Sequence, residues 1–154
     1  MSKRVIAVLS VAALVASITV LSALDASAGA PHREARLTGE KEVPGPGDPN
    51  GAGRASIKLN AQDRKVCYKL SFHRIGGPVA AHIHEAPRDE AGDVVVELFT
   101  ASKPLPGSFT AVKGCVGGIP RGEIRDIKEH PGRYYVNIHN VKYPDGAIRG
   151  QLHR

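Results

Sequence analysis

The chain has 154 residues, a formal net charge of +6 and 42% hydrophobic residues. This length excludes a large multidomain enzyme, because a typical domain takes roughly 100–150 residues. Aromatic residues make up only 5% of the chain, which argues against a stacking platform for single-stranded nucleic acid. The 17 glycines and 11 prolines predict many turns and argue against a helical bundle.

The first 28 residues have the organisation of an export signal. Lys3 and Arg4 precede an uncharged run over 5–24, and Ala26-Ser27-Ala28 matches the small-residue pattern of a signal peptidase site. A retained membrane anchor is the alternative, because about 20 apolar residues can span a bilayer. We expect cleavage after Ala28 and a secreted protein, whose destination is the medium, the periplasm or the cell wall.

Removal of this leader leaves a mature domain of 126 residues over 29–154, with a β-rich core over about 34–153. The mature charge is +5, because the leader contains two basic residues and one acidic residue. No second segment of the sequence is long enough to cross a membrane.

Cys67 and Cys115 are the only cysteines, and both lie in the mature domain. In an oxidising compartment such a pair favours a disulfide, while a thiolate pair on a metal or two free thiols are the alternatives. A disulfide across this 48-residue separation would stabilise the fold by about 4 kcal/mol.

In chain order, the first predicted strand covers 34–38, and a loop rich in proline and glycine follows over 41–53. Alternation of apolar and polar residues predicts strands over 55–59 and 65–72, separated by a turn over 60–63. In the second of these strands the alternation places Cys67 on the face opposite Tyr68.

The remaining predicted strands cover 79–84, 93–99, 108–116, 134–139 and 147–153. Ile124 and Ile127 have helical spacing, so we expect a short helix over 123–130 that ends before Pro131. A type I turn is expected over 143–146. The number of short strands predicts an all-β antiparallel sandwich or small barrel with one short helix.

The segment Ala81-His82-Ile83-His84-Glu85 is the most specific chemical feature of the sequence. In a strand His82 and His84 point to the same face, and imidazoles presented in this way can bind copper or zinc. His139 lies on the more polar face of its own strand and could complete a three-histidine site if the two strands are neighbours. A shared metal requires ring nitrogens within about 4 Å of one another. The alternative is architectural, with the histidines and a polar network of Asn137, Arg149 and Gln151 hydrogen-bonded to one another or to the backbone.

Two clusters of charged residues each have a simple interpretation as solvated surface beside a more specific one as a binding site. The acidic residues of the loop between two strands could gather Ca²⁺, but they lack the ligand spacing of a recognised calcium loop, so we favour a solvated acidic loop; they are Glu85, Asp89, Glu90 and Asp93. A basic cluster surrounds the predicted helix; it comprises Arg121, Arg125, Lys128 and Arg133. Its simpler interpretation is a solvated helix face, and the alternative is attraction to an anionic polymer or cell surface. No base-reading motif is present, so no specific nucleic-acid partner is expected.

Four blocks of the sequence resemble the CHRD family, the domain first recognised in chordin and common in exported bacterial proteins. They are LTGEKEVP at 37–44, GRAS at 53–56, AHIH at 81–84 together with VVV at 94–96, and YYVNIH at 134–139 continued by YPDGAIRGQL at 143–152. The resemblance implies an extracellular all-β domain of immunoglobulin-like sandwich type. The growth-factor binding of chordin is not implied, because this chain has a single copy and lacks cysteine-rich modules.

The segment from His82 to Glu85 is also similar to the copper-ligand strand of Cu,Zn superoxide dismutase, which suggests a related Greek-key sandwich. On this analogy His82 and His84 would be copper ligands. The zinc-binding loop of that enzyme has no counterpart here, and neither His73 nor His130 lies in a matching motif.

The sequence therefore supports two hypotheses. We favour a secreted, non-catalytic binding module whose partner is an extracellular protein, a polymer or a surface ligand. The alternative is a copper-dependent redox enzyme with His82, His84 and His139 as metal ligands. No cofactor is dictated by the sequence; copper and zinc are the two candidates that the histidines could bind. Catalytic residues and oligomeric state are not assigned.

Overall fold

The computed structural model describes residues 31–154, and the predicted export signal at 1–28 lies outside this part of the chain. The described residues form eight strands, one α-helix and two short 3-10 helices. In chain order they are β1 (His32–Thr38), η1 (Gly39–Lys41), β2 (Ala52–Asn60), β3 (Lys65–His73), β4 (Pro78–Glu85), β5 (Asp93–Thr100), β6 (Ala111–Gly117), α1 (Arg121–Glu129), η2 (Pro131–Arg133), β7 (Tyr134–Asn140) and β8 (Ile148–Gln151).

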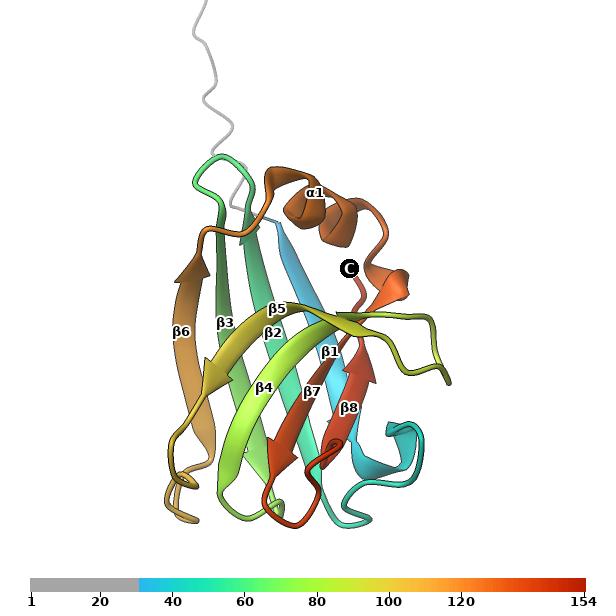
Figure 1. The fold of residues 1–154 in the computed structure, drawn as a ribbon, viewed down its shortest axis with the longest axis vertical. Helices are drawn as coiled ribbons and strands as arrows, with labels where there is room; N and C mark the ends of the chain where they lie inside the picture. The colour runs from blue at the N-terminus through green and yellow to red at the C-terminus, as the bar shows by residue number, and fades with distance from the viewer. Residues whose placement is uncertain (1–30) are drawn as a thin grey trace, which may run out of the picture.

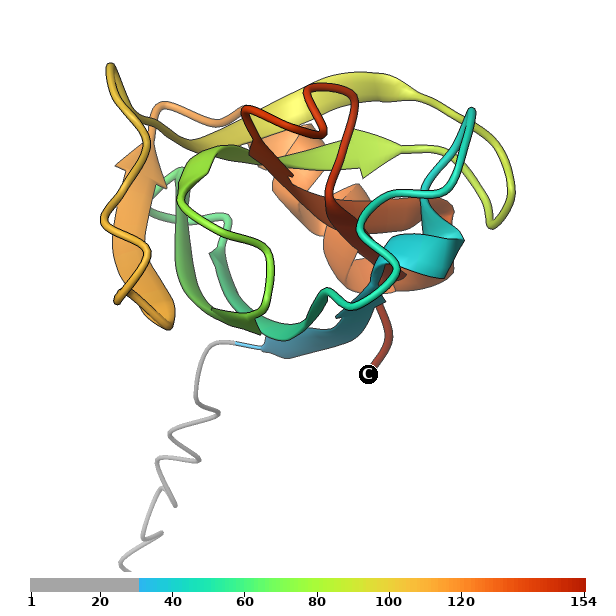
Figure 2. The same cartoon turned by 90° about the horizontal axis from the view of Figure 1, so that it is seen from below.

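All eight strands belong to one antiparallel sheet in the order β5-β4-β7-β8-β1-β2-β3-β6. The sheet curls so that β5, β4, β7 and β8 face the other four strands across a common interior (Figures 1 and 2). This arrangement is a sandwich-like, nearly closed barrel, and it confirms the all-β fold predicted from the sequence.

The core follows from the alternation of apolar residues along the strands. Ile57 on β2, Ile83 on β4 and Ile138 on β7 are all fully buried, so both sides of the sandwich contribute to the same core. Burial of such a side chain contributes roughly 1.5–3 kcal/mol. Helix α1 covers one end of the sandwich and inserts Ile124 and Ile127 into that core (Figure 1). The predicted helix is therefore confirmed, and it begins at Arg121, directly after Pro120.

Several element boundaries differ from the expectations. Strand β1 begins at His32 rather than at 34, and β2 covers Ala52–Asn60 rather than 55–59, so it includes the end of the predicted loop over 41–53. Strand β6 begins at Ala111 rather than at 108, because the backbone N–H of Phe109 donates to Pro106 O at 2.9 Å in a turn. Strand β8 ends at Gln151, and His153 makes only an isolated bridge to Glu34. A turn over 143–146 is present, since the N–H of Gly146 donates to Tyr143 O at 3.3 Å.

The predicted disulfide joins two neighbouring strands. Cys67 on β3 and Cys115 on β6 are direct register partners, and their sulfur atoms are 2.10 Å apart. Cys67 lies on the face opposite the buried Tyr68, as the alternation predicted. The bond thus ties the edge strand β6 to the rest of the sheet. Within residues 31–154 no helix is both long and apolar enough to cross a membrane.

Candidate functional site

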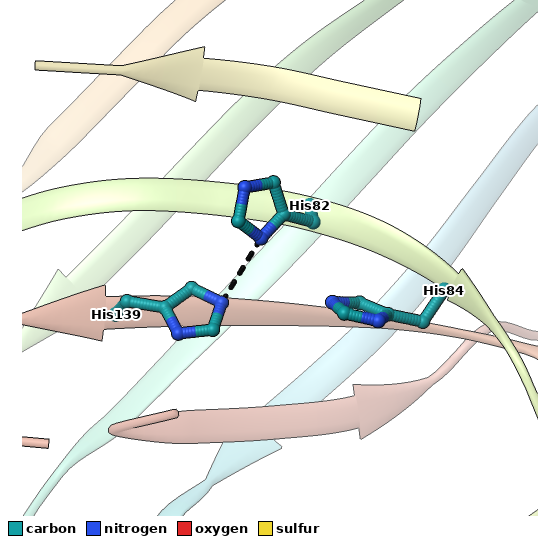
Figure 3. Close-up of side chains that lie close together, drawn as sticks. All are labelled: His82, His84 and His139. Atoms are coloured by element: carbon teal, nitrogen blue, oxygen red, sulfur yellow. Dashed lines mark hydrogen bonds between the residues drawn. The ribbon is translucent and has the colours of Figure 1, made fainter. Parts of the chain in front are cut away.

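Three histidines converge on the outer face of the sheet, where β4 and β7 pair. His82 and His84 alternate with the buried Ile83 on β4, and His139 comes from β7. One ring nitrogen from each histidine faces the cluster, and these three nitrogen atoms all lie within 4.8 Å of one another. The closest pair is His82 Nδ1 and His139 Nε2, which are 3.0 Å apart (Figure 3). Among residues 31–154 this is the one group of three or more potential metal ligands.

The separation of 4.8 Å exceeds the roughly 4 Å that a shared metal requires. A metal could therefore bind all three rings only after a shift of about 1 Å in at least one side chain. His82 is the least buried of the three and makes no hydrogen bond to the backbone of the described residues, so it is the ring that can move most easily.

Backbone carbonyls orient the two buried rings. Nδ1–H of His139 donates to Pro144 O at 2.8 Å, which leaves the lone pair on Nε2 directed at His82. Nδ1 of His84 lies 2.8 Å from Gly92 O, while its Nε2 lies 3.1 Å from Oδ1 of Asn137. Both of these partners are oxygen acceptors, and a neutral imidazole has a single N–H, so His84 can donate to only one of them. When it donates to Gly92, Nε2 is unprotonated and can bind a metal once the amide of Asn137 turns its Oδ1 away from the ring.

The surroundings keep these rings uncharged. Burial, together with the neighbouring His139 and His84 rings, lowers the pKa of His82 to about 4. Burial also lowers the pKa of His84 and of His139. The neutral imidazole is the form that binds metal ions, so the cluster does not have to lose protons at neutral pH.

The histidine cluster continues into an aromatic and cationic stack. The ring of His84 lies parallel to that of Tyr135, with centroids 4.7 Å apart. The guanidinium carbon of Arg149 lies 3.4 Å from the centroid of the same Tyr135 ring. The Tyr135 ring on β7 is therefore in contact with a side chain from each neighbouring strand, His84 on β4 and Arg149 on β8.

Asn137, Arg149 and Gln151 lie together on β7 and β8, but their hydrogen bonds do not link them to one another. Asn137 contacts His84, as described above. Nη2 of Arg149 donates to Pro87 O at 3.0 Å, and Nε2 of Gln151 donates to Ala86 O at 2.7 Å. These last two bonds hold the loop between β4 and β5 against the sheet, and this is the loop that supplies the Gly92 carbonyl to His84.

The other candidates from the sequence lie apart from the cluster. His73 and His130 are exposed, and His130 Nδ1 is 2.9 Å from Asp126. Glu85 pairs with Arg133, while Asp89, Glu90 and Asp93 are exposed and belong to no potential metal group within the described residues. The remaining members of the predicted basic cluster are exposed on helix α1; they are Arg121, Arg125 and Lys128.

Glu42 is a notable residue that the sequence did not single out. It is 7% exposed, its Oε1 has no hydrogen-bond partner among residues 31–154, and burial raises its pKa to about 8. Its carboxyl group packs on Gly146, where any side chain would overlap it. The residue lies at the start of a loop rich in proline and glycine, and such a loop carries no periodicity from which burial can be inferred.

The comparisons with known proteins agree with the fold. The CHRD domain family matches residues 33–152, which is most of the described structure. Comparison with curated proteins and with solved structures gave no significant match. The resemblance noted in the sequence therefore holds along nearly the whole domain, and the chain belongs to the CHRD domain family.

Proposed function

We propose that this CHRD domain is a secreted, non-catalytic binding module and that His82, His84 and His139 bind one copper or zinc ion. The observation that carries the proposal is the convergence of three ring nitrogens within 4.8 Å on one face of the sheet. The disulfide between Cys67 and Cys115 supports an oxidising, extracytoplasmic location.

The hydrogen bonds around the cluster favour a metal site. Histidines that bind metals usually donate their other N–H to a carbonyl or carboxylate, which fixes the tautomer. His84 and His139 both have this arrangement, with Gly92 O and Pro144 O as the acceptors. Metal binding would replace the His82–His139 hydrogen bond and the contact of His84 with Asn137.

A binding role agrees with the number of ligands. Three protein ligands leave at least one coordination position for water or for a donor group of a partner. A CHRD domain bound to copper or zinc could therefore recognise an extracellular molecule through the metal. The same open position is the one observation that favours the second candidate function, a copper-dependent redox enzyme.

Calorimetric titration of the exported protein with Cu²⁺ and Zn²⁺ tests the proposal. We expect one ion per chain and loss of binding in the His82→Ala/His84→Ala double variant. The matched control is His32→Ala/His73→Ala, because both of these histidines are exposed and outside the cluster. The control should bind the metal as the unmodified protein does.

Equal and negligible heats from the unmodified protein and the double variant would refute metal binding and leave a purely architectural role for the histidines. If copper binds tightly, superoxide and peroxide turnover by the loaded protein distinguishes the two functions. Turnover that is lost with His82 and His84 would establish the redox enzyme, and its absence would support the binding module.

A further inference from the structure

A polar cavity of about 210 Å³ lies on the same outer face as the histidine cluster, and its lining includes Arg149 and Gln151 of the polar network. Four of its lining side chains are cationic and come from separate parts of the chain: Arg36 on β1, Lys41 on η1, Arg88 in the loop between β4 and β5, and Arg149 on β8. The fold therefore gathers positive charge that is dispersed along the sequence.

The cations of this cavity form no close ion pair among the described residues. Asp89 is the one carboxylate that lines it, and within residues 31–154 none of the four cations has a carboxylate oxygen within 4.0 Å. Burial and the positive charges of Arg88 and Arg36 lower the pKa of Lys41.

Arg149 gives the strongest indication of a missing ligand. It is only 2% exposed and lines the cavity, and its Nη1 has no hydrogen-bond partner in the structure. A buried charge without a counterion or a complete set of hydrogen bonds is costly. The buried carboxyl of Glu42 interacts with Arg149, but its pKa of about 8 leaves it mainly protonated at pH 7.

We propose that this cavity is a binding site for an oxyanion group, a phosphate or a sulfate. Guanidinium groups bind such oxygens through paired, charge-assisted hydrogen bonds, and Lys41, whose Nζ donates to Arg36 O at 3.0 Å, adds a point charge. Arg36 and Arg88 are exposed, so a ligand can enter from solvent. The group is either a free anion or an ester on a larger molecule, and this site does not depend on metal binding by the histidines.

The test uses the metal-free exported protein, titrated with inorganic phosphate and with inorganic sulfate at constant ionic strength. Amide NMR shifts should saturate and concentrate in the loop over 86–92 and in the segment over 149–153. We expect the Lys41→Gln/Arg88→Gln variant to bind at least about tenfold more weakly, because it loses two charge-assisted contacts. These two residues are not in the core, so the variant should fold.

The matched control is Arg121→Gln/Arg125→Gln, which removes the same charge from exposed positions on helix α1. Unchanged affinity in this control supports a specific site, whereas equal weakening in both variants would overturn the proposal. Shifts that never saturate would also overturn it. Titrations with dextran sulfate and with glycerol phosphate identify the source of the anion. If either ester binds much more tightly than the corresponding inorganic ion, the ligand is an ester on a larger molecule. If the ester and the inorganic ion bind equally, the ligand is a free anion.

Discussion

Glu42 allows a quantitative test of burial in this fold. Its carboxyl is 7% exposed, has no hydrogen bond at Oε1 and has a pKa raised from 4.5 to about 8, chiefly by burial. The folded protein therefore binds the proton more tightly than the unfolded chain does. Stability from this group is fully present below pH 4.5 and is lost as the pH rises through about 8.

The pKa difference determines the size of the effect. Because the pKa rises from 4.5 to about 8, full ionisation of Glu42 lowers the free energy of unfolding by about 5 kcal/mol. About 3 kcal/mol of this loss has already occurred at pH 7. Glutamine is similar in shape and uncharged, so Glu42→Gln should be more stable than the unmodified protein at pH 7. We expect this advantage to grow by about 2–3 kcal/mol between pH 5 and pH 7.

Urea unfolding at a series of pH values measures this difference directly. The difference between the free energies of unfolding of the two proteins at each pH removes the contribution of the histidines, which both proteins share. The lowered pKa values of these histidines reduce stability as the pH falls below about 6.5, which is the opposite direction to the effect of Glu42. The control is Glu40→Gln, an exposed position two residues earlier, which should show no such growth. If the stabilities of Glu42→Gln and the unmodified protein run parallel from pH 5 to pH 8, the carboxyl is not buried as the structure describes.

Two further predictions concern the disulfide and the loop that orients the histidines. Reduction of the Cys67–Cys115 bond, which closes a separation of 48 residues, should lower the free energy of unfolding by about 4 kcal/mol in urea titrations. Two alkylatable thiols in the oxidised protein, detected by mass spectrometry, would contradict this pairing. Gly92→Ala should weaken metal binding roughly 10–100-fold, because a Cβ there would overlap a β4 carbonyl and displace the acceptor of His84. Gly107→Ala, which has no atom near the added Cβ, is the control in the same calorimetric titration, and equal affinities in the two variants would show that the loop does not orient the ring.

Local patterns in the sequence were sufficient to predict the strands. The alternation in β3 placed Val66 and Tyr68 in the core and Cys67 on the other face, and the same rule put His82 and His84 side by side. These predictions succeed because side chains of a strand alternate between two faces whatever the rest of the fold does. The boundaries of β1, β2, β6 and β8 were less accurate, because they depend on turns and on the length of the neighbouring strand.

The composition and alternation of this chain thus determined an all-β domain with a cysteine pair and a histidine pair on defined faces. Tertiary structure alone decided that β7 lies beside β4, which brings His139 to His82 across 57 residues of sequence. It also decided that Arg36 and Arg149 line one cavity and that Glu42 is buried. The physical reason is that strand order and loop packing arise from the burial of a shared core. This core brings together segments that are far apart in the chain, and the local sequence of one segment does not indicate which other segment it will contact.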